Sequence, residues 1–334
     1  MKKLNVAIMG ATGAVGREMI KVLEERSFPI NKLVLLASKR SVGTKIRFNN
    51  EDLVVEELSP DSFKGIDIVL GASPNKIALE FAPYIVKAGA IFIDNSSAFR
   101  MNEDVPLVVP EINPTDAYNN KGIISNPNCS TIISLVAINA INKLSKIKAI
   151  NACTYQATSG AGASGPKELV EQINALNEGK SLEAKTFTHQ IAYNLIPHIG
   201  SFLDNGYTTE EMKMQNEGRK IMHLPELLVN CTCVRVPIIR SHSISLTLVT
   251  ENKLQIEDVK KAISIEKGCV LYDDPSSNKY PMPLLTSDQD LVYVGRIRKD
   301  LLNENGISLF CCGDQVRKGA ATNAIQIAEL FVNN

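Results

Sequence analysis

The sequence predicts an α/β protein with a doubly wound, mostly parallel sheet in its N-terminal part and a second, α+β domain after it. Two observations carry this prediction. Short apolar runs alternate with a helical pattern up to residue 125, as they do in successive β-α-β units. Farther along the chain the apolar runs are longer and polar helical stretches separate them, which is typical of an α+β domain.

The N-terminal domain is expected to open with a β-α-β unit. Residues 6–9 are an apolar run that ends at a glycine, residues 17–26 have helical character, and residues 33–37 form a second apolar run. The same pattern predicts further strands at 53–56, 66–70, 91–94 and 123–125, and a helix at 76–87.

The second domain is expected to begin with a helix at Cys129. Asn126-Pro127-Asn128 is turn chemistry, and the apolar residues that follow recur at helical spacing. The strands expected after this helix cover 148–157, 231–239 and 244–250, and the stretch 273–283, rich in Pro and Ser, is expected to be a surface loop.

The last predicted helix covers 320–332, where Ala324, Ile327, Ala328 and Phe331 form one apolar stripe. Because such a stripe needs a partner, we expect this helix to return to the first domain. The predicted domains are therefore 1–127 together with about 313–334, and 128–312.

Composition argues against several classes of function. The 334 residues include 36 Lys and Arg against 36 Asp and Glu, so no basic excess indicates a nucleic acid or an anionic membrane as partner. Neither a signal-peptide cleavage site nor an apolar run of about 20 residues is present, and we expect a cytoplasmic protein. Seven cysteines without a framework spacing are expected to be reduced, and four histidines without paired spacing predict no metal site.

A glycine-rich loop, Gly10-Ala-Thr-Gly13-Ala-Val-Gly16, follows the first strand and opens a helix. Glycines let the backbone approach a pyrophosphate, and the helix N-terminus favours its negative charge. This is the context of a Rossmann-type dinucleotide-binding loop, with an ordinary β-α turn as the alternative. The cofactor-binding residues expected here are Gly10, Thr12, Gly13, Ala14, Val15 and Gly16.

The end of the second strand favours NADP over NAD as the cofactor. Enzymes that bind NAD carry an acidic residue there for the ribose hydroxyls, and residues 37–41 contain none. Ser38 and Arg40 supply a hydroxyl and a guanidinium, which suit a 2′-phosphate. Solvated loop cations are the alternative explanation.

Cys129 is the candidate nucleophile. At a helix start, unpaired backbone N–H groups and the helix dipole favour an anion, and therefore the thiolate form of a cysteine. The alternative is a cysteine that packs as a small hydrophobe, which is the commoner role of this residue type.

Several motifs, in this order, resemble those of the aspartate-semialdehyde dehydrogenase family. They are GATGAVG at 10–16, NSSAFR at 95–100, SNPNCST at 125–131, TYQA at 154–157, RVPIIRSHS at 235–243 and RKGAA at 317–321. The resemblance covers essentially the whole chain, and the cysteine and histidine motifs together are highly specific.

The resemblance implies a reductive dephosphorylation in amino-acid biosynthesis from aspartate, toward lysine, threonine and methionine. In it, L-aspartyl 4-phosphate, NADPH and a proton give L-aspartate 4-semialdehyde, NADP and phosphate. Cys129 would attack the acyl phosphate and form a thioester, which a hydride then reduces. His242 would be the general acid/base, first taking the thiol proton and later protonating the thiohemiacetal oxygen. Gln156 would orient the acyl group, with a structural core amide as the alternative.

Substrate-binding residues also carry over by position from the family. Arg100 and Asn128 match residues that contact phosphate, and Arg235 matches the arginine that holds the substrate α-carboxylate through a bidentate fork. Glu217 matches the residue that takes the α-amino group, and Lys220 matches a further phosphate contact. Their spacing of three puts both on one face of a helix.

Two departures from the family's pattern concern the cofactor. Residues 71–75, where Ser73 is the expected contact, are less glycine-rich than the family's loop. Gln315 stands where many relatives have asparagine near the nicotinamide, and we expect it to act as a longer amide in the same role. The resemblance also implies a homodimer or a dimer of dimers, formed through the second domain.

Two other classes of function are open. A related reductase on the same scaffold, such as an N-acetyl-glutamyl-phosphate reductase or a malonyl-CoA reductase, would not need Glu217 opposite an α-amino group. A non-catalytic dehydrogenase-like protein would not need Cys129 and His242 together.

Overall fold

The structure, a computed structural model, describes residues 2–332, which form two compact units. The first unit contains the residues up to Asn128 together with those from Ala320 onward, and the second runs from Cys129 to Gly319. Residues 313–319 were predicted to belong to the first domain, and this was wrong. The reason is that Asp314 bonds to Arg240 and Gln315 bonds to the Ser241 N–H, both within the second unit.

The first unit is built on a six-stranded parallel sheet with the order β5-β2-β1-β6-β7-β8. This is the order of a doubly wound dinucleotide-binding sheet, in which the direction of winding reverses between β1 and β6. The predicted fold class is confirmed. The strands are β1 (Leu4–Met9), β2 (Ile30–Ala37), β5 (Glu56–Glu57), β6 (Ile68–Gly71), β7 (Ile91–Asp94) and β8 (Ile123–Ser125).

The predicted strand at 53–56 was wrong, because this stretch is divided between two sheets. Its first part belongs to β4 (Glu51–Val54), which pairs with β3 (Lys45–Phe48) in a separate antiparallel hairpin. The turn between them consists of Asn49 and Asn50, both at positive φ (46° and 68°), as the tight turns that join hairpin strands require. Asparagine tolerates this conformation better than other residues with a side chain.

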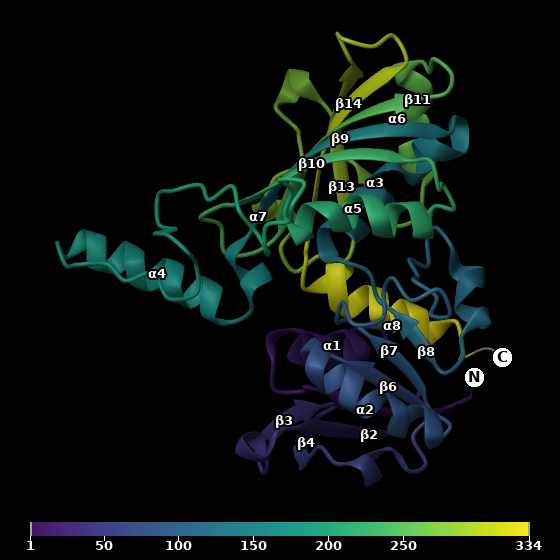
Figure 1. The fold of residues 1–334 in the computed structure, drawn as a ribbon, viewed down its shortest axis with the longest axis vertical. Helices are drawn as coiled ribbons and strands as arrows, with labels where there is room; N and C mark the ends of the chain where they lie inside the picture. Colours follow the sequence, from purple (N-terminus) through teal and green to yellow (C-terminus); the bar gives the residue numbers. More distant parts are fainter. Residues whose placement is uncertain (1, 333–334) are drawn as a thin grey trace. The chain divides into compact units, whose positions relative to one another are not determined.

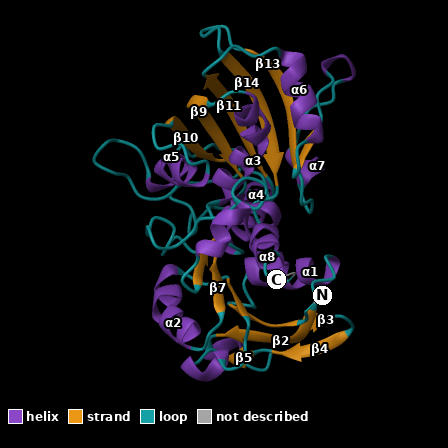
Figure 2. Ribbon diagram, turned by 90° about the vertical axis from the view of Figure 1, so that its right-hand side faces the viewer, coloured by secondary structure: helices purple, strands orange, loops and turns teal. Residues whose placement is uncertain are grey.

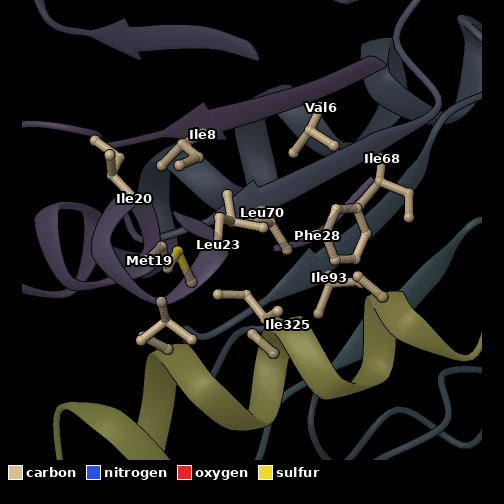
Figure 3. Close-up of a cluster of buried hydrophobic side chains, with 14 of the residues drawn as sticks. Val6, Ile8, Met19, Ile20, Leu23, Phe28, Ile68, Leu70, Ile93 and Ile325 are labelled. Atoms are coloured by element: carbon tan, nitrogen blue, oxygen red, sulfur yellow. The ribbon is translucent and has the colours of Figure 1, made fainter. Parts of the chain in front are cut away.

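Helices cover both faces of the parallel sheet. The helices of this unit are α1 (Ala14–Glu25), α2 (Asn75–Lys87) and α8 (Thr322–Glu329). Figure 3 shows Ile325 of α8 beside Leu70 and Ile93, which are sheet residues, and beside Met19 and Leu23 of α1. The residues of α2 pack in a separate cluster on the other face. The return of the C-terminal helix to the first domain is thereby confirmed, although the α-helix is shorter than predicted and follows a π-helical turn, Arg317–Ala321.

The second unit is built on a mixed six-stranded sheet with the order β10-β9-β11-β14-β13-β12. Strands β9 and β10 run parallel, whereas β11 is antiparallel to both β9 and β14. The strands are β9 (Ile147–Gln156), β10 (Leu228–Arg235), β11 (His242–Thr250), β12 (Cys269–Leu271), β13 (Val292–Lys299) and β14 (Gly306–Gly313). Consequently the last residues of β9 and β10 and the first residue of β11 lie at the same end of three adjacent strands.

Helices α3 (Cys129–Leu144), α5 (Thr209–Ile221) and α6 (Ile256–Ile265) pack against this sheet, and α3 contacts both of the others. Figures 1 and 2 show these helices. Helix α3 starts at Cys129 as predicted, and all of its residues from Ser130 to Ile141 are buried. Its position places Cys129 beside the first residue of β11. The helices of this unit are α3 (Cys129–Leu144), α4 (Ser164–Asn177), α5 (Thr209–Ile221), α6 (Ile256–Ile265) and α7 (Pro283–Thr286).

Within residues 2–332 no helix combines the length and the apolar character that a membrane span needs. The same residues contain no group of three or more His, Cys, Asp or Glu side chains that could hold a metal ion.

Candidate active site

The loop between β1 and α1 leaves its backbone uncovered. Gly10 has a φ of +91°, and a Cβ atom there would lie 2.5 Å from the carbonyl oxygen of Ala72. A Cβ at Gly16 would overlap the carbonyl oxygen of Gly10. Gly13, the N-cap of α1, makes no side-chain cap, so no cap from this residue covers the backbone N–H groups of the first turn. The exposed backbone of this loop, together with the start of α1, fits a pyrophosphate group at a helix N-terminus.

The other predicted cofactor residues of the first unit lie at the same edge of the parallel sheet, where its winding reverses. The Thr12 hydroxyl lies 3.4 Å from the Ser41 hydroxyl and joins the glycine loop to the turn after β2. Ser73 follows β6, and its buried hydroxyl has no hydrogen-bond partner among the described residues. Ala14 and Val15 open α1, and Ser38 and Arg40 are exposed in the turn after β2.

Arg100 is a buried arginine that the first unit holds by its backbone. Its Nε donates to the carbonyl of Asn126 at 3.0 Å, and its Nη2 donates to the carbonyl of Asn95 at 2.8 Å. Asn126 is held in turn by Asn323 of α8, whose Nδ2 donates to the Asn126 Oδ1 at 2.6 Å. The buried Asn128 ends this unit and directly precedes Cys129 in the chain.

Cys129 and His242, the predicted nucleophile and acid/base, lie side by side in the second unit. The Sγ of Cys129 lies 3.5 Å from the Nε2 of His242, a residue that is completely buried. The backbone N–H of Ala157 donates to the Nδ1 of His242 at 3.1 Å. A ring nitrogen that accepts this bond carries no proton, so the proton of the neutral imidazole is on Nε2 and faces the sulfur.

Burial sets the charge of His242. It lowers the pKa of the imidazole to about 3, and the positive charge of Arg235 acts in the same direction. The ring is therefore neutral near pH 7, and its Nε2–H is a hydrogen-bond donor. A neutral imidazole donates a hydrogen bond but is too weak an acid to give up its Nε2 proton near pH 7. An Nε2 that accepts the thiol proton would require a proton on Nδ1, opposite the Ala157 N–H. The acid/base role of His242 therefore stays a prediction.

Gln156 is the last residue of β9 and is buried. Its Nε2 lies 3.3 Å from the Thr154 Oγ1 and 3.3 Å from a carboxylate oxygen of Glu210, which stands in the first turn of α5. Glu210 was not singled out from the sequence. The available signal was a weak one: Glu210 precedes Glu217 by seven residues, and both fall on the buried face of α5.

Arg235 ends β10 in register with Gln156 and carries a buried charge. Its Nη1 donates to the Ala157 carbonyl at 2.7 Å, and within residues 2–332 no carboxylate lies within 4 Å of its guanidinium. Burial accordingly lowers the pKa of Arg235, whereas Cys129 and Glu210 act in the opposite direction. A buried guanidinium in this state suits an incoming carboxylate.

Two glycines that sequence reasoning missed keep this site open. A Cβ at Gly160 would lie 2.7 Å from the Arg235 Nη1 and 3.1 Å from the Cε1 of His242. A Cβ at Gly319 would lie 2.8 Å from the Cβ of Cys129. A larger residue at either position would displace a side chain of the reactive group.

The remaining predicted residues of the second unit lie on α5 and after β14. Glu217 is buried and Lys220 is half-buried, and α5 packs against β10, which ends in Arg235. The amide of Gln315 is engaged at both ends, since its Oε1 accepts from the Ser241 N–H at 2.8 Å and its Nε2 donates to the Ser159 hydroxyl. Gln315 therefore braces the residue before His242, and its contact with the cofactor stays a prediction.

Comparisons with known proteins identify the family of this chain. Residues 5–120 match the family described as semialdehyde dehydrogenase, NAD binding domain, and residues 138–318 match semialdehyde dehydrogenase, dimerisation domain. The aspartate-semialdehyde dehydrogenase of Aquifex aeolicus is 49% identical over 331 residues, which cover 98% of this chain and 97% of that one. The chain belongs to the aspartate-semialdehyde dehydrogenase family.

Two solved structures of aspartate-semialdehyde dehydrogenases extend the comparison. The Vibrio cholerae enzyme II, complexed with ASA, aligns with a TM-score of 0.98 at 43% identity and covers 100% of this chain and 99% of its own. The Candida albicans enzyme, with NADP, aligns with a TM-score of 0.76 at 25% identity and covers 98% of each chain.

Family membership confirms the main predictions from the sequence. The chain is an oxidoreductase with a nicotinamide-dinucleotide domain, and its reaction is the reductive dephosphorylation of the aspartate pathway. The aspartate-semialdehyde dehydrogenase fold places the Cys129 and His242 pair at one edge of the second sheet.

Proposed function

We propose that Cys129 is the nucleophile of an NADPH-dependent reduction of L-aspartyl 4-phosphate to L-aspartate 4-semialdehyde, and that the neutral imidazole of His242 donates a hydrogen bond to the reacting groups. The contact between the Cys129 Sγ and the His242 Nε2 carries this proposal, because the Ala157 N–H fixes the proton on the nitrogen that faces the sulfur. A thiolate accepts that hydrogen bond, and the start of α3 favours its negative charge.

The residues of the second unit act in a defined order. The thiolate of Cys129 attacks the acyl carbon, and the carbon–oxygen bond to phosphate breaks to leave a thioester. NADPH, when bound, supplies the hydride that reduces this thioester. The Nε2–H of His242 stabilises the oxygen of each tetrahedral intermediate, and collapse of the last one returns the thiolate and releases the aldehyde. The proton consumed overall ends on phosphate.

Charged and polar side chains bind the ends of the substrate in this proposal. Arg235 takes the α-carboxylate, which supplies the anion that its buried guanidinium lacks. We assign the α-amino group to the buried Glu217, and phosphate to Lys220, Arg100 and Asn128. A substrate with both a free carboxylate and a free amine distinguishes this enzyme from a reductase of acetylated amino acids or of thioesters.

We further propose NADP as the cofactor. Arg40 and Ser38 are exposed in the turn after β2, at the edge of the sheet where the adenosine ribose of a dinucleotide lies. A guanidinium and a hydroxyl suit the 2′-phosphate, and the Candida albicans relative is a structure with NADP.

The assembly we propose is a homodimer, or a dimer of dimers, formed through the second unit. A mostly apolar hollow there is lined by Tyr155, Val236, Pro237, Ile238 and Phe310 among others. The match to a dimerisation domain over residues 138–318 supports this assignment. We place the protein in the cytoplasm, since a nucleophilic Cys129 requires a compartment that keeps thiols reduced.

The test is the reverse reaction, followed by NADPH absorbance. Aspartate semialdehyde should reduce NADP only when inorganic phosphate is present, because phosphate must release the acyl group from Cys129. Reduction at the same rate without phosphate, or no reduction with both present, would contradict the proposal. N-acetyl-glutamate semialdehyde serves as the comparison substrate, and we expect it to be inactive.

A further inference from the structure

Glu210 is a buried carboxylate that the reaction steps above do not use. It is 9% exposed, although it stands in the first turn of α5. One of its oxygens lies 3.3 Å from the Gln156 Nε2, and the other lies 2.8 Å from the Nζ of Lys213. The same side chain therefore joins a surface-side cation to an amide of the active site.

The carboxylate decides which way the Gln156 amide points. An ionised carboxylate only accepts hydrogen bonds, and the ion pair with Lys213 favours that form. The amide must then turn its NH₂ end toward Glu210. The Thr154 hydroxyl cannot make this choice, because a hydroxyl can donate to an amide oxygen or accept from an amide nitrogen equally well.

These hydrogen bonds leave only the oxygen of the Gln156 amide for a ligand. Both N–H groups of Gln156 have acceptors, Thr154 and Glu210, whereas its Oε1 takes no hydrogen bond from any residue between 2 and 332. Gln156 therefore offers an acceptor to the substrate, and His242 offers a donor through Nε2. An acyl oxygen is itself an acceptor, so the Gln156 Oε1 repels it and the Nε2–H of His242 attracts it.

We propose that Glu210 is a positioning residue, which fixes the Gln156 amide and thereby directs the acyl oxygen toward the Nε2–H of His242. The inference rests on the proposed function, since it assigns a geometry to the thioester on Cys129. If Glu210 had only a structural role, its loss would disturb the whole site. In the proposed role, its loss acts on the reaction through one side chain, that of Gln156.

The charge of Glu210 gives a second, independent signature. This carboxylate raises the pKa of both Arg235 and His242 against the effect of their burial, so its field reaches the place where the substrate carboxylate binds. Replacing Glu210 by glutamine removes a negative charge near Arg235. Binding of an anionic substrate should not weaken, whereas a general loosening of the site would weaken it.

The experiment is a double-mutant cycle of Glu210→Gln and Gln156→Ala with aspartate semialdehyde, phosphate and NADP. We expect Glu210→Gln to lower kcat by about 10-fold, the effect of one lost orienting hydrogen bond, with no rise in the KM for aspartate semialdehyde. Because Glu210 acts through Gln156, the double variant should have the kcat of Gln156→Ala alone.

Glu211→Gln is the matched control. Glu211 stands next to Glu210 on α5 and is also 9% exposed, but it accepts from the backbone N–H groups of Thr208 and Cys233. This variant should lower the thermal unfolding temperature and keep kcat within about 2-fold of the wild type. If Glu210→Gln does not fold, Glu210→Asp replaces it, since it keeps the charge but withdraws the carboxylate from the amide.

Three results would overturn the inference: an unchanged kcat in the Glu210 variant, effects that multiply in the double variant, or a KM for aspartate semialdehyde that rises together with a fall in kcat. These results leave the wild-type reaction and its need for Cys129 intact, so they do not bear on the proposed function. A wild-type kcat in Gln156→Ala would overturn both this inference and the role proposed for Gln156.

Discussion

Arg100 and Arg235 are buried arginines, one in each unit, and the protein holds them in different ways. Two backbone carbonyls hold the guanidinium of Arg100, and a network of asparagines ties one of them to α8. Arg235 has one carbonyl, that of Ala157, and no carboxylate within 4 Å among the described residues. The comparison indicates that backbone carbonyls position Arg100, whereas we propose that a ligand satisfies the charge of Arg235.

The largest effect is expected for Arg235, which has no carboxylate within 4 Å among the described residues. Removal of one partner from a buried ion pair costs roughly 2 to 5 kcal/mol, so Arg235→Ala should lose on the order of 30-fold or more in kcat/KM for aspartate semialdehyde. The dissociation constant for NADPH, measured by fluorescence, should stay near that of the wild type. Activity within a few-fold of the wild type would make Arg235 a structural residue.

The next prediction concerns the neutral form of the His242 imidazole, which burial and the positive charge of Arg235 both favour. The pKa of this imidazole is about 3 in the folded state and near 6.5 in the unfolded chain, so the unfolded state binds the additional proton below pH 6.5. Stability is fully present above that pH and falls as the pH drops toward 3. Between pH 7.5 and pH 5 the loss should be roughly 2 kcal/mol.

His242→Gln should lack this loss, because glutamine does not titrate. The free energy of unfolding in urea, measured for both proteins at pH 7.5 and pH 5, gives the difference directly. An equal pH dependence in the two proteins would mean that the pKa of His242 is the same in the folded and unfolded states, and would contradict the prediction.

A third, exposed arginine sharpens the comparison. Arg40 lies in the turn after β2 and is solvated, so a contact from it is weaker than one from a buried guanidinium. Arg40→Ala should raise the KM for NADPH by about 10-fold and leave that for NADH nearly unchanged, because only NADPH carries the 2′-phosphate. Steady-state rates with both cofactors measure this, and equal effects would remove the assignment of NADP.

The smallest effect is expected where the fold supports Arg100 from a distance. Asn323→Ala removes the hydrogen bond to Asn126 and should raise the KM for phosphate by about 3-fold, consistent with a loss near 1 kcal/mol. Asn113→Ala is the control, since Asn113 is also buried in the first unit but bonds to the Leu107 carbonyl and the Val109 N–H. An equal rise in both variants would indicate general loosening of the unit.

The sequence was most informative where a backbone feature defines the structure. Alternating apolar runs located β7 and β8 at their observed bounds, and the turn at Asn126 located the start of α3. The hairpin at Asn49 and Asn50 was missed, because its polar strands carry little apolar signal. Strands β12, β13 and β14 were not anticipated either, since their place depends on pairing with partners distant in the chain.

At the site, too, the sequence could not predict features that depend on contacts between residues distant in the chain. Motifs located Cys129 and His242, but they could not give the tautomer of His242, which depends on one N–H, that of Ala157. Glu210 was beyond sequence reasoning, since a glutamate in the first turn of a helix is ordinary and only the packing of α5 brings it to Gln156. Gln315 was expected at the cofactor, and the fold engages both ends of its amide within the second unit.

The most direct test asks whether the acyl group is carried on Cys129. L-Aspartyl 4-phosphate is mixed with the enzyme without NADPH, the reaction is quenched in acid, and the peptides are mapped by mass. We expect one aspartyl group on Cys129, none on the other six cysteines, and none on any residue of a folded Cys129→Ala protein. A Cys129→Ala protein that still reduces the acyl phosphate at a comparable rate, or an acyl group found on another residue, would contradict the account.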